Sequence, residues 1–184
     1  MILPVLIGMP GRVTIGLYNS YDPVKFHESH RRALARAGPL ALAFDCNLAT
    51  FGFPYNKDLS TPAEIAAWVS TTTSIGESGA YLIELAQRGR FSCFDFPKKG
   101  FPPQLGEAVT TTRKPSKQKS VDAVQIRSDL KAGRSVLLVF GLGPRGLPKE
   151  VFQITEKHLD ITGRGLSLET CTALGAVIGS LLGK

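Results

Sequence analysis

The feature that most constrains the fold is an apolar run, Ser135 to Phe140, that leads directly into three glycines within six residues. A run without polar alternation indicates a strand that is buried on both faces, as in the centre of a parallel sheet. The glycines Gly141, Gly143 and Gly146 predict tight turns and a close approach of the backbone to something, because glycine has no Cβ and tolerates positive φ.

Strand and helix signals alternate along the whole chain, which predicts an α/β fold with a mainly parallel sheet flanked by helices. We expect strands at Arg12–Tyr18, Leu40–Phe44, Phe91–Phe94, Ala108–Thr112, Ser135–Phe140 and His158–Ile161. We expect helices from Pro23 to Ala37 (stopped by Gly38-Pro39), from Thr61, at Gly79–Arg88, at Val121–Lys131, from Pro148 and, capped by Ser167, at Leu168–Leu182. Asp45 and Asn47, after the expected second strand, are minor candidates for the acceptor site.

The glycine-rich segment does not fit the standard phosphate-binding loops. Gly141–Gly146 has the form G-x-G-x-x-G, but Pro148 follows at once and no long helix begins there. A Rossmann unit would also need an acidic residue after a second strand, and no G-x-x-x-x-G-K-[ST] motif is present.

The last third of the chain resembles the SPOUT class of RNA methyltransferases, especially its SpoU/TrmH-like branch. The matching elements are the strand and loop Val136–Pro148, the strand end Leu159–Ile161 and the segment Leu166–Ala173, with their Gly-Leu-Pro and Ser-Leu elements. The order and the spacing of these elements agree with the class. We expect a divergent, archaeal branch.

The resemblance implies one SPOUT-like α/β domain over residues 1–184, with a C-terminal deep trefoil knot. A helical insertion is expected at about residues 47–89, and the knotted cofactor-binding half at about residues 105–184. Three loops would bind S-adenosylmethionine: 109–113, 141–147 and 161–168. Within them, the resemblance assigns cofactor binding to Thr110, Thr111, Thr112, Gly141, Leu142, Gly143, Gly146, Leu147, Ile161, Leu166, Ser167 and Leu168.

The resemblance also implies a catalytic arginine and RNA contacts. In the TrmH-like branch an arginine stands six residues before a glycine that precedes the second strand. Arg32 has this spacing to Gly38, with Arg31 as the alternative. Arg113, Lys114 and Arg145 are the candidates for RNA binding. Two residues depart from the class: Pro144 stands near the position of its loop glutamate, and Glu169 replaces its asparagine after Ser-Leu.

Composition agrees with a nucleic-acid partner. The chain has 22 Lys and Arg against 15 Asp and Glu, a formal charge of +7, which favours polyanions. Three scattered cysteines without a C-x-x-C pair indicate reduced thiols, and their spacing predicts no metal site. The first ten residues lack the basic region of a signal peptide, and the apolar C-terminal stretch is shorter than the about 20 residues of a membrane span. We therefore expect a cytoplasmic protein without a membrane partner. The resemblance to the SPOUT class further implies a homodimer.

Three functions follow as hypotheses. The first is an S-adenosylmethionine-dependent RNA methyltransferase that acts on tRNA or rRNA, at a ribose 2′-hydroxyl. The second is a non-catalytic RNA-binding or assembly protein on the same scaffold, which the departures at Pro144 and Glu169 favour. The third is an unrelated nucleotide-binding α/β protein in which the glycine-rich loop holds phosphate.

Overall fold

Seven parallel strands form one sheet in the computed structural model, which describes residues 9–72 and 74–183. The strands are β1 (Val13–Tyr18), β2 (Asn47–Phe51), β3 (Phe91–Phe94), β4 (Glu107–Thr111), β5 (Ser120–Val121), β6 (Val136–Gly141) and β7 (Lys157–Leu159). They lie in the order β3-β2-β1-β6-β4-β7-β5, and every pairing is parallel. The predicted α/β class with a parallel sheet is confirmed.

The apolar run of the sequence is β6, which lies between β1 and β4. Its residues from Val136 to Phe140 are all buried. Leu138 and Phe140 pack with the helices on one face, and Leu137 and Val139 pack with a second, smaller cluster on the other face. An apolar residue is needed at each position because both faces of this strand are covered.

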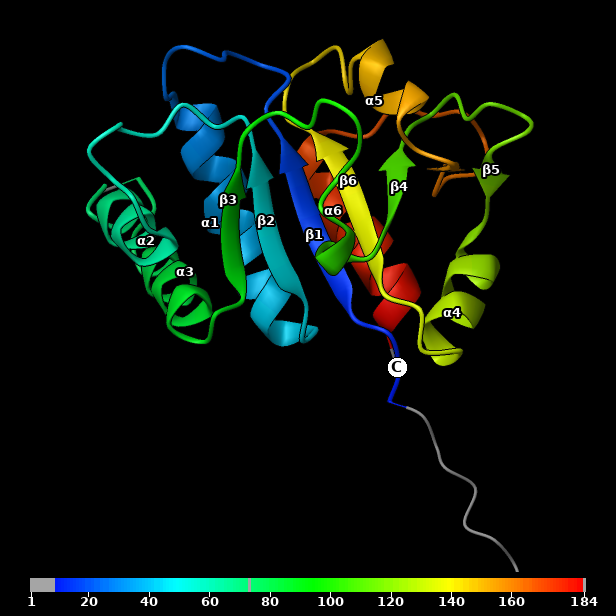
Figure 1. The fold of residues 1–184 in the computed structure, drawn as a ribbon, viewed down its shortest axis with the longest axis horizontal. Helices are drawn as coiled ribbons and strands as arrows, with labels where there is room; N and C mark the ends of the chain where they lie inside the picture. Colours follow the sequence, from blue (N-terminus) through cyan, green and yellow to red (C-terminus); the bar gives the residue numbers. More distant parts are fainter. Residues whose placement is uncertain (1–8, 73, 184) are drawn as a thin grey trace, which may run out of the picture.

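Helices cover the sheet unevenly (Figure 1). Behind the sheet in that view lie α1 (Glu28–Ala43) and α6 (Thr170–Leu182), which pack on each other, while α4 (Ala123–Lys131) lies beside them and contacts α6. At one side, α2 (Pro62–Ser70) and α3 (Ser78–Gln87) form a pair, and α3 packs on α1. The front carries the connection from β3 to β4 with a 3-10 turn (Pro103–Leu105), and α5 (Lys149–Gln153) lies at the carboxyl end of the strands.

The expected strand at residues 40–44 is wrong. Residues 40–43 are the last turn of α1, which continues through Gly38 and Pro39, and Phe44 is its C-cap. A proline inside a helix costs about 3 kcal/mol. The fully buried Leu34, together with Ala37 and Ala41 on the same face, offsets that cost, since burying one leucine side chain contributes about 1.5–3 kcal/mol. Packing on the sheet therefore overrides the local stop signal.

The true second strand, β2, begins at Asn47, and this changes the reading of its neighbours. Residues 47–51 belong to the sheet, so only the part from α2 to α3 is helical. Asp45 precedes β2 and Asn47 is its first residue, so both lie at its amino end, where the Asp45 carboxylate pairs with Arg90 (2.7 Å). They are thus at the opposite end of the strand from an acceptor site at the carboxyl edge.

Residues 1–8, on which the expectation about a signal peptide mainly depends, lie outside the described part of the chain. Within residues 9–72 and 74–183, none of the helices has the length and apolarity that crossing a bilayer requires.

Candidate functional site

A hollow of about 1100 Å³ lies at the carboxyl ends of β4, β6 and β7. Three loops (residues 111–116, 141–147 and 159–169) line it together with parts of α5 and α6. Thr110 is the one predicted cofactor residue outside its lining, because its side chain is buried within β4. The predicted residues that line it are Thr111, Thr112, Arg113, Lys114, Gly141, Leu142, Gly143, Arg145, Gly146, Leu147, Ile161, Leu166, Ser167 and Leu168.

The glycine loop is shaped by contacts within the chain. A Cβ at Gly143 would lie 2.4 Å from the carbonyl oxygen of Ser20, and one at Gly141 would lie 2.7 Å from the carbonyl carbon of Gly146. Gly146 has a φ of +71°, in the left-handed region that favours glycine. The Gly143 N–H donates to the Ser20 hydroxyl (3.0 Å). The close approach expected from the sequence is thus an approach to Ser20 and within the loop.

The third loop is organised by Asp160, which the sequence did not single out. Its carboxylate accepts hydrogen bonds from the Thr162 N–H (3.0 Å), the Thr162 hydroxyl (2.7 Å) and the Gly165 N–H (2.8 Å). Burial raises the pKa of Asp160, but these bonds outweigh burial and lower it. A negatively charged Asp160 therefore holds the loop in the shape that lines the hollow. An aspartate two residues before a threonine is the local signal for such a turn.

Glu169, not Ser167, caps α6. The Glu169 carboxylate accepts the N–H groups of Cys171 (2.9 Å) and Thr172 (3.2 Å), so the expected cap at Ser167 is wrong. A carboxylate suits this position because the first N–H groups of a helix have no partner within the helix. The Thr170 hydroxyl donates to the Gly141 carbonyl (2.9 Å) and ties α6 to the glycine loop.

The lining fits a ligand with both apolar and anionic parts. Phe140, Leu142, Ala173 and Val177 supply an apolar floor next to α6. At the mouth, Leu166 is 60% exposed and adds apolar surface to the lining. A volume of about 1100 Å³, slightly above the about 300–1000 Å³ range of small-molecule sites, is sufficient for a nucleoside cofactor.

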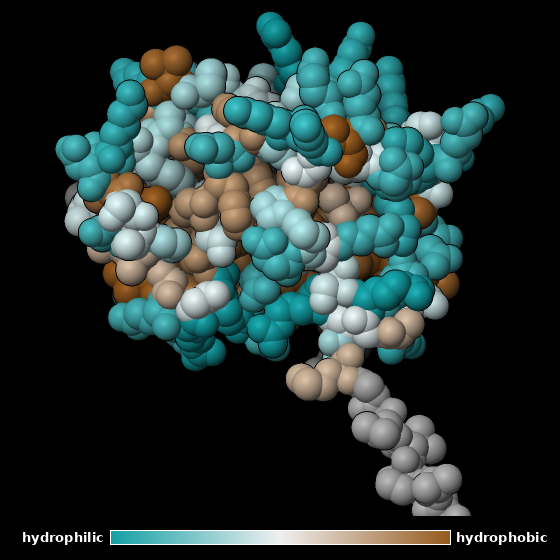
Figure 2. All heavy atoms as spheres, viewed as in Figure 1, coloured by the Kyte–Doolittle hydropathy of each residue, from teal (hydrophilic) through white to brown (hydrophobic). Residues whose placement is uncertain are grey.

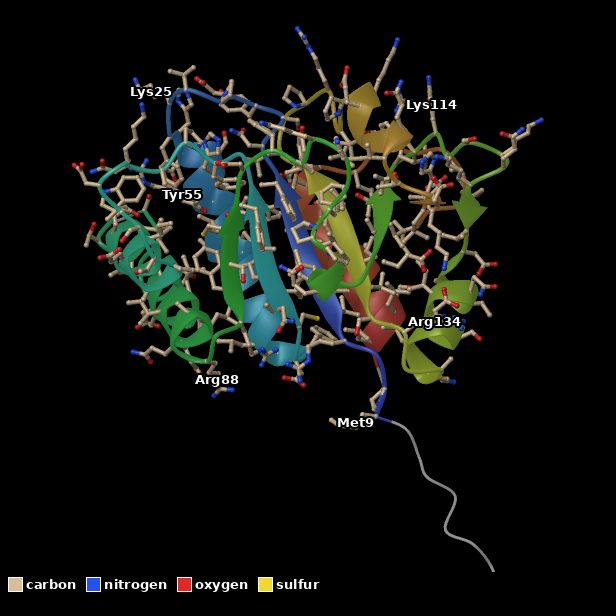
Figure 3. All side chains as sticks on the ribbon, in the orientation of Figure 1. Met9, Lys25, Tyr55, Arg88, Lys114 and Arg134 are labelled. Carbon is tan, nitrogen blue, oxygen red and sulfur yellow. The ribbon has the colours of Figure 1, made fainter. Side chains whose placement is uncertain are left out.

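The rim of the hollow is basic. Arg113, Lys114, Arg145 and Lys149 line it and are exposed, and no ion pair joins them to a carboxylate among the described residues. In Figure 2 hydrophilic side chains cover this end of the molecule, and in Figure 3 the labelled Lys114 lies among the side chains there. Such a rim attracts phosphate groups.

The two candidate arginines do not line this hollow. The Arg31 guanidinium lies over the rings of Phe26 (5.0 Å) and Trp68 (5.9 Å), toward α2. Arg32 lines a second hollow of about 500 Å³ with Arg36, and Glu169 lines both hollows. The spacing argument for Arg32 is wrong in its premise, because Gly38 lies inside α1 and does not precede the second strand.

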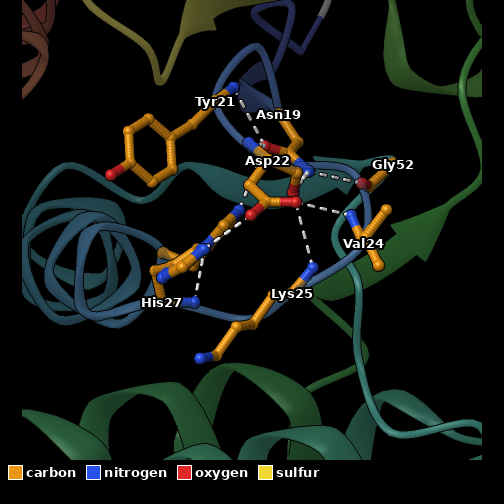
Figure 4. A network of polar contacts seen from close by, with 8 residues as sticks. Asn19, Tyr21, Asp22, Val24, Lys25, His27 and Gly52 are labelled. Atoms are coloured by element: carbon orange, nitrogen blue, oxygen red, sulfur yellow. Dashed lines mark hydrogen bonds and ion pairs between the residues drawn. The ribbon is translucent and has the colours of Figure 1, made fainter.

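Asn19 anchors the loop between β1 and α1 (Figure 4). Its side-chain oxygen accepts hydrogen bonds from the N–H groups of Tyr21 and Asp22 (both 3.2 Å) and contacts His30 Nε2 (3.0 Å). His30 is fully buried, and burial lowers its pKa to about 4. His27 contacts the Asp22 carboxylate (2.6 Å) and holds the pKa of Asp22 at about 2. His30 is therefore a residue of the core.

Groups of three or more potential ligands from His, Cys, Asp and Glu do not occur in the part of the chain that the structure describes. The three cysteines, Cys46, Cys93 and Cys171, are unpaired.

Comparison with known families gives one match over most of the chain. The model of the family described as "Protein of unknown function (DUF531)" matches residues 13–182. The protein described as "Uncharacterized protein MJ0224" of Methanocaldococcus jannaschii is 40% identical over 166 residues, which are 90% of each chain.

Comparison with solved structures shows the fold. A probable methylase family protein from Haemophilus influenzae Rd KW20 has a TM-score of 0.58 at 13% identity, over 93% of this chain and 65% of its own. The SpoU methyltransferase AviRb from Streptomyces viridochromogenes has a TM-score of 0.57 at 14% identity, over 94% and 59%. A structure described by the 2-OH methylation of C/U34 on tRNA has a TM-score of 0.56 at 15% identity, over 94% and 95%. The chain has the fold of SpoU-type methyltransferases and spans about two thirds or less of two of these proteins.

Proposed function

The chain belongs to the DUF531 family, and we propose that it is an S-adenosylmethionine-dependent RNA methyltransferase with a tRNA or rRNA substrate. The observation that carries this proposal is the hollow at the carboxyl edge, where three loops and a basic rim meet on a SpoU-type fold. We assign the methyl acceptor as a ribose 2′-hydroxyl, in line with the structural neighbour concerned with 2-OH methylation of tRNA.

The residues of the hollow fit this cofactor. Leu142, Leu166 and Leu168 would hold its adenosine part by apolar contact, with Thr111, Thr112, Ile161 and Ser167 beside them. The cofactor supplies an activated methyl group, so the protein has only to position the acceptor and assist the loss of its proton. Thr110, beneath the loop, supports this site from within β4.

Arg32 is the proposed group for activating the acceptor, with Arg31 as the alternative. Arg32 supports this role better, because its hollow shares Glu169 with the cofactor hollow, whereas Arg31 is engaged with Phe26 and Trp68. A guanidinium stabilises a developing alkoxide electrostatically and stays charged at every pH of interest.

The RNA would approach the basic rim, where Arg113, Lys114 and Arg145 neutralise phosphates. We further propose that the protein is a cytoplasmic homodimer whose interface includes the exposed face of α6. We also propose that residues from about 105 to the end of α6 form a trefoil knot. Gly175 and Ala176 leave this face of α6 without bulky side chains.

A pair of glycine substitutions tests the cofactor site. Gly143→Ala should reduce S-adenosylmethionine affinity by about tenfold or more, because the new Cβ meets the Ser20 backbone at 2.4 Å and forces the loop to move. Gly38→Ala is the matched control. Its Cβ would lie at an ordinary 3.6 Å from the Tyr81 side chain, and residue 38 is far from the glycine loop in the sequence. Calorimetric titration with S-adenosylmethionine and S-adenosylhomocysteine measures both. Absence of binding by folded wild type contradicts the proposal.

Methyl transfer separates the enzyme from its rival. We expect transfer of labelled methyl groups to tRNA or rRNA, reduced at least about a hundredfold in Arg32→Ala. The rival, an RNA-binding protein without turnover, is favoured by Glu169, whose carboxylate is engaged as the α6 cap. If the protein binds the cofactor and binds RNA but transfers labelled methyl groups to no class of RNA, the result supports the rival.

A further inference from the structure

The hollow extends beyond the part assigned to the cofactor. On the side of α6 it is lined by the glycine loop and by apolar residues of that helix. On the side of α5, which lies at the top in Figure 1, its lining comes from other elements: Lys114, Ser116, Lys149, Phe152 and His158. A volume of about 1100 Å³ leaves room for a second group next to one cofactor molecule.

His158 is the central residue of the α5 side. It is 3% exposed, and its Nδ1 accepts a hydrogen bond from the Ser116 N–H (3.2 Å). Burial lowers the pKa of His158, so the ring is neutral at pH 7, and the proton then resides on Nε2, since a neutral imidazole carries one donor and one acceptor nitrogen.

This donor has no partner. Nε2 is buried and makes no hydrogen bond within the described residues. The carbonyl oxygen of Phe152 is near enough to raise the pKa of His158, but this contact falls short of hydrogen-bond geometry, and the same oxygen accepts a hydrogen bond from Lys119 Nζ (3.4 Å). A buried donor without an acceptor costs about 1–3 kcal/mol, so its retention in the lining of a hollow points to an acceptor on a ligand.

The surroundings of His158 indicate what that ligand is. The half-buried ring of Phe152 stands edge-on to the imidazole (centroids 5.2 Å apart) and offers apolar surface beside it. Lys114 and Lys149, both exposed and outside every ion pair of the described residues, supply positive charge at the mouth. An aromatic ring, one directed donor and flanking lysines are the elements with which proteins bind an unstacked nucleotide of single-stranded RNA.

We propose that the α5 side of the hollow is a nucleotide subsite for one unstacked base of a single-stranded RNA segment. His158 Nε2–H donates to a carbonyl oxygen or ring nitrogen of that base, Phe152 contacts its face, and Lys114 and Lys149 neutralise the adjacent phosphates. This inference rests on the proposed function, because it assigns the RNA segment that would be placed next to the cofactor.

Two substitutions of His158 distinguish recognition from support of the loop. His158→Gln places an amide N–H near the position of Nε2, whereas His158→Asn places an amide oxygen near that of Nδ1 and keeps the bond to the Ser116 N–H. We expect His158→Asn to weaken binding of nucleoside monophosphates and of a short single-stranded oligoribonucleotide by about tenfold, and His158→Gln to stay within about threefold of wild type. The reverse order, with the asparagine variant normal and the glutamine variant impaired, would show that His158 only supports the loop and would overturn the proposal.

Further variants test the remaining elements of the subsite. Phe152→Leu should weaken nucleotide binding. Lys149→Gln should reduce the slope of log affinity against log salt concentration for oligoribonucleotide binding by about 1. The control Lys131→Gln, on α4, should leave this slope unchanged. If every His158 variant binds inorganic phosphate and all four nucleoside monophosphates equally well, only charge determines binding, and this result would also overturn the proposed nucleotide subsite.

Cofactor titrations on the same proteins separate the two proposals. The His158 variants should keep wild-type affinity for S-adenosylmethionine. If wild type binds nucleotide through His158 but no cofactor, the methyltransferase proposal fails and the subsite remains. If it binds cofactor but no nucleotide, the subsite fails and the methyltransferase proposal remains.

Discussion

At the scale of single residues, the least replaceable polar group is Asp129. It is 2% exposed, and its carboxylate accepts hydrogen bonds from Lys157 (2.6 Å), Arg134 and Gln125, so it joins α4 to β7. We expect Asp129→Asn to lower the free energy of unfolding by about 2 kcal/mol, because it leaves the Lys157 ammonium with a weaker acceptor. Urea denaturation measures this effect. Asp45→Asn is the control: the Asp45 side chain is 78% exposed and its ion pair contributes at most about 1 kcal/mol. Equal losses in both variants would contradict the assigned role of Asp129.

At the scale of elements, the helices α1 and α3 each contain a glycine, but the space around the two glycines differs. Gly38→Ala should raise the unfolding free energy by about 0.5–1 kcal/mol, because alanine favours a helix interior and the new Cβ only reaches ordinary contact with Tyr81 (3.6 Å). Gly79→Ala should instead lower it by about 1–3 kcal/mol, since its Cβ would lie 2.6 Å from that of Ser70, where α3 meets α2. Thermal unfolding of the two variants measures both signs, and a gain in stability for Gly79→Ala would refute the close packing of α2 on α3.

At the scale of the whole molecule, acid should act on the fold in two stages. The pKa of His30 is lowered from 6.5 to about 4 by burial, so the unfolded chain binds a proton that the folded chain does not, and stability falls as the pH drops from about 6.5 to about 4. The pKa of Asp129 is lowered from 3.8 to about 2 by Lys157 and Arg134, so its contribution is present above about pH 4 and is lost toward pH 2.

The first stage is open to measurement. Between pH 7.5 and pH 5 we expect a loss of about 2 kcal/mol in the free energy of unfolding, from denaturant titrations. His30→Gln cannot titrate at this position, so it should be less stable at pH 7.5 and should lose most of this pH dependence, with a remainder from His158, whose pKa burial also lowers. A slope in the variant equal to that of wild type would exclude His30 as its source. Because His30 contacts Asn19, and the neighbouring Ser20 contacts Gly143, the same loss of stability should reach the glycine loop.

Most of the lining of the candidate site was predicted through the resemblance of the last third of the chain to the SPOUT class. The glycine loop, the loop that begins at the end of β4 and the loop from β7 to the Ser-Leu segment line one hollow, because parallel strands place their carboxyl ends on one edge. His158 and Asp160 were missed, since a single histidine in a strand, or an aspartate in a loop, has many ordinary explanations. Only the contacts to Ser116 and Thr162 distinguish them.

What the sequence determined by itself is the α/β class, the central strand β6 and the loops at its carboxyl edge, because a doubly buried strand and its glycines are dictated by local chemistry. Tertiary structure alone decided the course of α1 through Gly38 and Pro39, the start of β2 at Asn47 and the positions of Arg31 and Arg32. In these places burial against the sheet and against α3 is worth more than the local preference for a stop, and no local pattern records the surface on which a helix will pack.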